Sequence, residues 1–247
     1  MVFNIVADIA KLGLFIVCAY ALLGAYARRR RPHWAEQLTK RRLAVLAALT
    51  LGAGGIKLIE DVVAKESGPV DEAILWFIRD HVPAALNDFF AIVTFSGSAR
   101  FLLPTAVVAA IALRLARRRF EAVLLGSSVI IATLVVWSMK AIVGRARPAL
   151  WDAQWYWGSS FPSGHTLSTA AFSAAAALCL ARNCPRARTL AMALAMLWTG
   201  LVAVSRLVLG VHWPSDVLVA MCLGFFIPLM ISVANDLRPP MPGARRQ

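Results

Sequence analysis

The sequence predicts an all-α protein, a polytopic bundle of transmembrane helices. Hydrophobic residues make up 60% of the 247 positions, whereas a soluble domain contains about 45–50%. They gather in stretches of about 20 residues, the length that an α-helix needs to cross a membrane. The predicted spans lie at about 5–27, 43–62, 99–116, 120–141, 164–181, 188–207 and 214–235.

The first span leaves three interpretations open. Asp8 and Lys11 interrupt its apolar run, and Ala25-Tyr26-Ala27 resembles the end of a signal peptide. An uncleaved span, a helix at the membrane interface and a cleaved signal are therefore all considered. Cleavage would leave the arginine run at 28–31 outside the cell, against the positive-inside rule, so the uncleaved span is favoured.

Basic residues orient the other spans. The net charge is +13, and 17 of the 26 lysines and arginines lie in three loops and the C-terminal tail that fall on one side of the predicted membrane. This side is predicted to be cytoplasmic. The basic residues stand in short runs between apolar spans rather than on one face of a folded domain, which argues against a nucleic-acid partner and indicates contact with anionic membrane lipids. The acidic residues concentrate in the loop after the second span, which is predicted to lie on the opposite side.

Two connecting regions have features of their own. The third span is short, and Pro104 interrupts it. In the acidic loop, Ile74, Phe77 and Ile78 recur at helical spacing and predict a helix over 71–82. This helix either lies at the outer membrane interface beside the site or packs on the bundle.

The sequence gives no reason to expect a metal or a disulfide framework. The four cysteines (Cys18, Cys179, Cys184 and Cys222) are scattered and form no C-x-x-C pair. No acidic cluster or nucleotide-binding loop that would hold a divalent cation is found. The expected chemistry therefore uses no cofactor.

Three short polar clusters stand at the outer ends of the spans. The first consists of Lys140 and, seven residues later, Arg147-Pro148, which is about two helical turns and hence nearly the same face. Arginine binds phosphate through two parallel N–H donors, and lysine acts as a mobile point charge. Taken alone, both residues could simply reach from a span end to the membrane surface. Arg145, between them, is interpreted in that way and is not assigned to the site.

The second cluster, Pro162-Ser163-Gly164-His165, directly precedes the fifth span. Serine is a good N-cap, and glycine allows close approach to the backbone. Free amides at a helix start favour an anion, and His165 would face the same bound group. The alternative is an ordinary helix cap followed by an incidental histidine.

The third cluster joins the last two spans. Ser205-Arg206 ends the sixth span, and His212 and Asp216 lie on one face of the seventh if that helix starts near Pro214. Asp216 would then accept from one imidazole nitrogen and leave the other nucleophilic. A purely structural histidine–aspartate pair is the alternative.

Together the three clusters supply the parts of a phosphoryl-transfer site. The transition state carries negative charge on three equatorial oxygens, which Lys140, Arg147, Arg206 and the amides near Ser163 and Gly164 would meet. His212 would attack the phosphorus. His165 would protonate the leaving oxygen and then deprotonate water.

In the patterns K-x6-R-P, P-S-G-H and S-R-x5-H-x3-D, residues 100–235 resemble the type 2 phosphatidic acid phosphatase (PAP2) family, also called the lipid phosphate phosphatase and vanadium haloperoxidase superfamily. The resemblance implies a core of six spans with the site at their outer ends, so that the segment before Arg28 is an addition. It implies that phosphate is held by Lys140, Arg147, Ser163, Gly164 and Arg206. It also implies that His165 is the acid and base, that His212 is the nucleophile and that Asp216 is its partner.

The sequence thus predicts a bacterial inner-membrane lipid phosphatase with its site facing the periplasm or exterior. The resemblance implies undecaprenyl diphosphate, phosphatidylglycerol phosphate, phosphatidic acid or lipid A as the substrate class. Alternatives are a phosphotransferase with a lipid or sugar acceptor, a non-catalytic transporter of anionic lipids, and a haloperoxidase, against which the several spans argue. The predicted units are an N-terminal span with a basic loop (1–42), the catalytic domain (43–237) and a basic tail (238–247). The oligomeric state is left open.

Overall fold

The computed structural model describes residues 2–151 and 158–238, which fold into helices without any strand in those ranges. Seven helical segments in this part of the chain are long and apolar enough to cross a membrane. The predicted fold class is therefore confirmed. The elements are α1 (Val2–Arg30), α2 (Pro32–Lys40), α3 (Arg42–Val63), α4 (Gly68–His81), η1 (Ala84–Leu86), α5 (Asn87–Ser96), α6 (Ala99–Leu115), α7 (Arg119–Val143), α8 (Gly164–Asn183), η2 (Pro185–Ala187), α9 (Arg188–Val208) and α10 (Pro214–Asp236).

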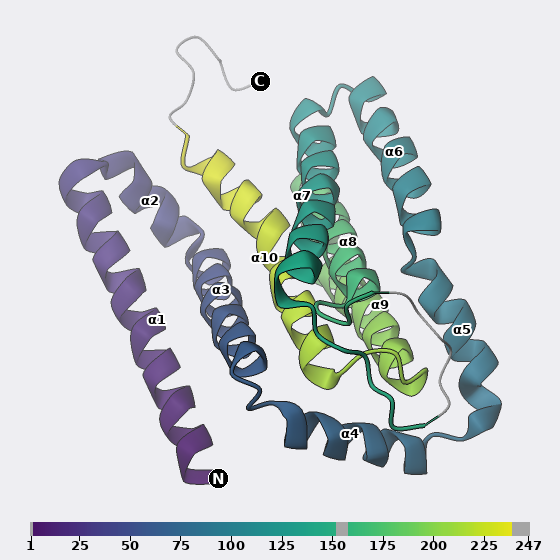
Figure 1. The fold of residues 1–247 in the computed structure, drawn as a ribbon. Coiled ribbons are helices and arrows are strands. Elements are labelled where there is room, and N and C mark those ends of the chain that lie inside the picture. Colours follow the sequence, from purple (N-terminus) through teal and green to yellow (C-terminus); the bar gives the residue numbers. More distant parts are fainter. Residues whose placement is uncertain (1, 152–157, 239–247) are drawn as a thin grey trace.

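Helix α8 is the centre of the bundle (Figure 1). It packs against α7, α9 and α10. Of an apolar 18-residue stretch of α8, 61% is buried inside the protein, the largest share among the spans. In the first span this share is 0%, and α1 packs mainly against α2 and α3. The helices that carry the three polar clusters therefore form the core, and α1 lies outside it.

Helices α8 and α10 approach each other closely at Gly224. A Cβ atom on this residue would lie 2.4 Å from Ala170 Cβ and 2.7 Å from the Leu167 carbonyl oxygen. Small residues let the backbones of membrane helices come together in this way. The contact fixes α8 against α10, and each of these helices begins beside one of the polar clusters.

The third span differs from its prediction. Residues 84–98 were assigned to the long acidic loop, but they form η1 and α5, and the span runs from Ala84 to Leu115. Its two helices meet at Gly97, where a Cβ atom would lie 2.7 Å from Val202 Cγ1. The Ser98 hydroxyl then caps α6 by accepting from the Phe101 amide at 3.3 Å. Close packing against Val202 of α9 and Thr169 of α8 thus requires a glycine at the point where α5 ends.

Helix α4, predicted over 71–82, lies across the ends of the other helices (Figure 1). Leu75 and Asp71 are buried, and α4 packs on α9 and α10. Trp76 and Phe77 are exposed on its outer side. The helix therefore covers the bundle with one face, while its predicted contact with the membrane interface stays a prediction.

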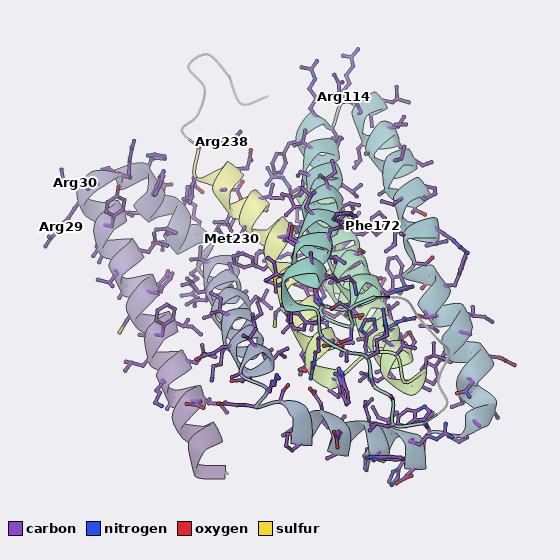
Figure 2. All side chains as sticks on the ribbon, viewed as in Figure 1. Arg29, Arg30, Arg114, Phe172, Met230 and Arg238 are labelled. Atoms are coloured by element: carbon purple, nitrogen blue, oxygen red, sulfur yellow. The ribbon has the colours of Figure 1, made fainter. Side chains whose placement is uncertain are left out.

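The basic residues gather at the end of the bundle opposite α4. Figure 2 shows Arg29, Arg30, Arg114 and Arg238 at this end. Residues 239–247, which carry the last two arginines of the predicted tail, lie outside the described residues. The clustering agrees with the charge pattern from which the cytoplasmic side was predicted.

Candidate active site

The first cluster lies at the C-terminal end of α7 and in the segment that follows it. The helix ends at Val143, so Arg147 is free of the helix and can turn toward the site. Gly144 adopts a left-handed backbone conformation (φ 60°) at the C-cap, which glycine tolerates. Lys140, in the last helical turn, donates to the Ser159 carbonyl. Arg147 donates from Nη1 to the Val211 carbonyl at 2.7 Å and from Nε to the Gly158 carbonyl at 3.2 Å. Both cations are thereby tied to the chain segments that carry the other two clusters.

The second cluster forms the start of α8. Ser163 occupies the N-cap position, but its side chain does not cap the helix as expected. Its buried hydroxyl lies 3.0 Å from the Thr166 hydroxyl, and its amide donates to the Asp216 carbonyl at 3.2 Å. The first-turn amides of Gly164 and His165 are thus left without a serine cap, as suits an anion site at a helix start.

The third cluster is the most deeply buried. Arg206 is 1% exposed and donates from Nη1 to the Thr94 hydroxyl of α5 at 2.7 Å. Asp216 lies in the first turn of α10, which begins at Pro214 as predicted. One Asp216 carboxylate oxygen, Oδ2, accepts from the Trp213 amide at 3.0 Å and lies 3.4 Å from His212 Nδ1. Helix α5, which the sequence prediction missed, therefore supplies a partner of a predicted site residue.

The two nitrogens of His212 have different surroundings. Nδ1 faces Asp216, and Nε2 lies 3.5 Å from Arg147 Nη1. Because a guanidinium only donates, this contact makes Nε2 the acceptor and places the proton on Nδ1. Burial, together with the charges of Arg206 and Arg147, lowers the pKa of His212 to about 4, although the hydrogen bond and charge of Asp216 oppose this shift. The ring is therefore neutral near pH 7, with a free electron pair on Nε2.

His165 lies close enough to the other site residues to interact with them electrostatically. Its ring experiences the charges of Arg206, Arg147 and Lys140 and interacts with His212. The eight predicted site residues thus come from the ends of α7, α8, α9 and α10 and meet at one end of the bundle. Their individual roles remain predictions.

Arg145, which the sequence analysis left outside the site, lies at its base. It donates from Nη1 to Asp216 Oδ1 and from Nη2 to Asp71 Oδ2, both at 2.7 Å. Its guanidinium also stacks over the Trp213 ring at 5.3 Å. Asp71, from α4, accepts in addition from the amide and hydroxyl of Ser215. A chain of charges, in which both carboxylates are buried and Arg145 is partly buried, therefore runs from α4 to the carboxylate that faces His212.

One feature of the sequence distinguishes Arg145 from a residue of the helix surface. Gly144 ends α7, so Arg145 follows the helix and need not continue its surface. For Asp71 the sequence offers no specific signal, because several acidic residues share its loop.

Comparisons with known proteins agree with this geometry. The family model described as PAP2 superfamily matches residues 121–238. Residues 121–238 belong to the PAP2 superfamily. The matched segment includes every predicted site residue and Arg145, whereas Asp71 and Thr94 lie before it.

Individual relatives support the same assignment. The chain is 36% identical over 88 residues to phosphatidylglycerophosphatase B of Escherichia coli (strain K12), which is 34% of each chain. It is 32% identical over 117 residues to lipid A 1-phosphatase of Rhizobium etli, or 43% of this chain and 47% of the relative. The chain thus spans about a third to a half of the length of these relatives.

A solved structure shares the fold. The PAP2-type phosphatidylglycerolphosphate phosphatase of Bacillus subtilis superposes with a TM-score of 0.71 and 23% identity, over 80% of this chain and 98% of that one. The chain is therefore a multi-span membrane protein, and its residues 121–238 match a superfamily to which bacterial membrane phosphatases also show similarity.

Proposed function

We propose that the chain is a membrane phosphatase that hydrolyses a phosphate monoester or diphosphate of a lipid through a phosphohistidine on His212. The orientation of the His212 ring carries the proposal. Asp216 faces its Nδ1, and the Arg147 guanidinium lies 3.5 Å from its Nε2. The nitrogen with the free electron pair therefore points to a place where cations would hold an anion.

In the first step, Nε2 of His212 attacks the phosphorus, and the bond between phosphorus and the lipid oxygen breaks. His165, which must enter this step as the protonated imidazolium, donates a proton to that oxygen and is left neutral. The charge that spreads over the equatorial oxygens is met by Lys140, Arg147 and Arg206 and by the first amides of α8. Asp216 stabilises the charge that forms on the ring of His212.

In the second step, water attacks the phosphorus and the P–N bond breaks. His165 accepts the proton of the water, inorganic phosphate leaves, and His212 is restored. The protein groups supply all the charge stabilisation, so the mechanism includes no metal. Removing one fixed donor in a site of this kind lowers turnover about 10²- to 10³-fold.

The substrate is proposed to be a lipid of the bacterial inner membrane, on its periplasmic or outer face. The names of the relatives support phosphatidylglycerol phosphate and lipid A as substrates, and undecaprenyl diphosphate and phosphatidic acid share the same phosphate chemistry. The positive-inside rule supports the orientation, since the basic residues gather at the end of the bundle opposite α4 (Figure 2).

Phosphate release by the purified full chain across these four lipids tests the function. We expect near-total loss in His212→Ala and retained activity in His81→Ala, which changes an exposed histidine of α4. A phosphoryl group trapped on the wild type and absent from His212→Ala would support the intermediate. Release of phosphate only when an acceptor lipid is added would instead indicate a phosphotransferase. Retained function of His212→Ala would favour the non-catalytic transporter.

Two reagents probe the anion site. EDTA should leave turnover intact, and strict Mg²⁺ dependence would contradict the mechanism. Vanadate should inhibit because it occupies the position of the phosphoryl group, and indifference to millimolar vanadate would count against the site.

Cysteine labelling tests the orientation. Glu66→Cys, in the exposed connection before α4, should react with an impermeant maleimide in intact cells. The native Cys184, exposed at the turn between α8 and α9, should react only after permeabilisation. Background labelling is removed with Cys18→Ser. The reverse pattern would place the site in the cytoplasm.

A further inference from the structure

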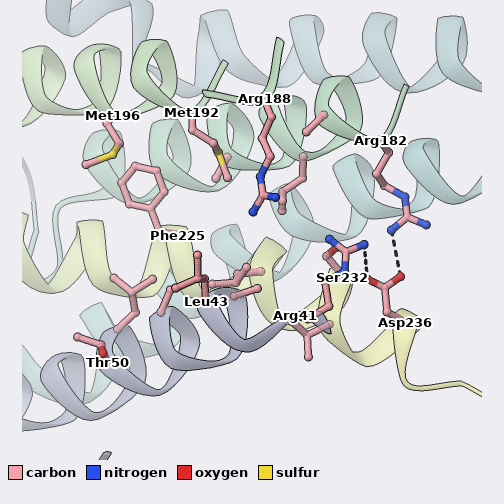
Figure 3. A pocket seen from close by; sticks show the side chains of 18 of the residues that line it. Arg41, Leu43, Thr50, Arg182, Arg188, Met192, Met196, Phe225, Ser232 and Asp236 are labelled. Carbon is pink, nitrogen blue, oxygen red and sulfur yellow. Dashed lines mark hydrogen bonds and ion pairs between the residues drawn. The ribbon is translucent and has the colours of Figure 1, made fainter. Parts of the chain in front are cut away.

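A cavity lies at the end of the bundle opposite the site. It has a volume of about 890 Å³ and is lined by side chains of α3, α8, α9 and α10 (Figure 3). Its walls are mostly apolar and include Leu43, Met192, Met196 and Phe225. Methionine side chains adapt to irregular apolar partners such as acyl chains. The volume falls within the range of about 300–1,000 Å³ that is typical of ligand sites.

Three arginines surround the opening of this cavity. Asp236 is the one carboxylate among the lining residues, and it is shared between Arg41 at 2.9 Å and Arg182 at 3.1 Å. Arg188 forms no ion pair within the part of the chain that the structure describes, and Figure 3 shows its guanidinium directed into the cavity. The lining therefore carries three positive charges and one negative charge. This surplus favours an anionic ligand.

The cavity is separate from the catalytic site. Asp216 and Asp236 belong to the first and last turns of the same helix, α10. Twenty residues of helix span about 30 Å, which is the thickness of the hydrocarbon core. A ligand at Asp236 would therefore belong to the membrane leaflet opposite the catalytic site. It would not be the substrate in its reactive position.

We propose that this cavity binds an anionic phospholipid of that leaflet. The phosphate would lie among Arg182, Arg188 and Arg41, and an acyl chain would run along Met192, Met196 and Phe225. Guanidinium groups bind phosphate through paired N–H donors, and basic pockets between membrane helices on the cytoplasmic side bind anionic headgroups. Because the cavity joins α3 to α8, α9 and α10, a bound lipid stabilises the folded bundle by mass action.

The test uses the delipidated full chain in detergent, titrated with phosphatidylglycerol or with phosphatidylcholine. We expect phosphatidylglycerol to raise Tm, and native mass spectrometry to detect one retained molecule. The double variant Arg182→Gln/Arg188→Gln should weaken this binding about 25-fold, taking about fivefold per basic residue near the membrane surface. The matched control is Arg114→Gln/Arg186→Gln, which removes two arginines of the same end that do not line the cavity. It should bind as the wild type does.

A steric variant tests the cavity independently of charge. Ala47 lines the wall and is exposed, so Ala47→Trp should fill the cavity and abolish retention of phosphatidylglycerol while turnover of a soluble phosphate ester stays unchanged. Equal binding by the wild type and both cavity variants would overturn the proposal. So would equal stabilisation by phosphatidylcholine, or a full Tm shift with glycerol phosphate, which lacks acyl chains.

Discussion

The two ends of the bundle hold similar charges in different environments. At the catalytic end, Arg145 lies 2.7 Å from both Asp71 and Asp216, and the two carboxylate side chains are only 3% and 0% exposed. At the other end, the Asp236 side chain is 14% exposed, and its partners Arg41 and Arg182 are 39% and 28% exposed, compared with 17% for Arg145. When one partner of a buried ion pair is removed, the remaining charge is out of reach of water. When one partner of an exposed pair is removed, water solvates the remaining charge at little cost. The first arrangement suits a fixed catalytic geometry, and the second leaves arginines able to rearrange around a ligand.

Substitution of Arg145 should produce the largest effect on stability. Arg145→Gln leaves Asp71 and Asp216 without their shared cation, so the free energy of unfolding should fall by about 3–5 kcal/mol. Turnover should also fall, because Arg145 holds Asp216, which in turn orients His212. Loss of residues that orient metal ligands in the same indirect way lowers activity about 10- to 100-fold, and we expect a similar loss here. Denaturation and steady-state kinetics measure the two effects.

The matched variant at the other end is Arg182→Gln. If both variants lost the same stability, the contrast between buried and exposed pairs would be wrong. Partial recovery of kcat in Arg145→Lys, with KM unchanged, would identify Arg145 as a positioning residue.

Acidification should destabilise the catalytic end through His212. Its pKa is about 4 in the folded chain and about 6.5 when unfolded. The unfolded chain therefore binds more protons between these values, and stability is lost as the pH falls from 6.5 to 4, by about 3 kcal/mol. Tm of the wild type and of His212→Gln, measured across this window, should approach each other as the pH falls. A constant difference would show that burial does not hold the ring neutral.

The helix contact that aligns the catalytic end can be strained directly. Gly224→Ala places a Cβ atom 2.4 Å from Ala170 Cβ, so α8 and α10 must move apart. Overpacking of this kind destabilises by about 1–3 kcal/mol. Gly126→Ala, where no atom lies within 4 Å of the new Cβ, is the control. Thermal unfolding of both variants checks the effect, and equal Tm values would contradict the role of this contact.

The spans were predictable from the sequence because membrane insertion acts on hydropathy along the chain. Six of the seven predicted spans coincide with helices to within a few residues at most boundaries, and α10 begins at the predicted Pro214. The exception is the third span. Asp88 places its first part among the acidic residues of the preceding loop, and the close approach at Gly97 involves residues of α8 and α9 that lie far along the chain.

Contacts within the site could be predicted from the sequence where the two residues lie close together along the chain. Contacts between residues of distant segments could not. His212 and Asp216 are four residues apart, so helical periodicity alone predicts their contact. Arg145 lies 74 residues from Asp71 and 71 from Asp216. No local pattern specifies such a pairing. The cavity at the opposite end was not predictable either, because an apolar residue that lines a pocket between spans resembles one that faces lipid.

The ion pair between Arg182 and Asp236, at the more exposed end of the bundle, should contribute the least to stability. A double-mutant cycle on Arg182→Gln and Asp236→Asn isolates their coupling, which we expect to be below about 1 kcal/mol because the pair lies at 3.1 Å with one partner 28% exposed. Added salt should reduce it further, since water and ions reach this end. The corresponding cycle on Arg145→Gln and Asp71→Asn should give a larger coupling that salt changes little. Equal couplings at the two ends would mean that position relative to solvent does not decide their strength. The arginines around the cavity would then be held as firmly as Arg145 and could not rearrange around a phosphate.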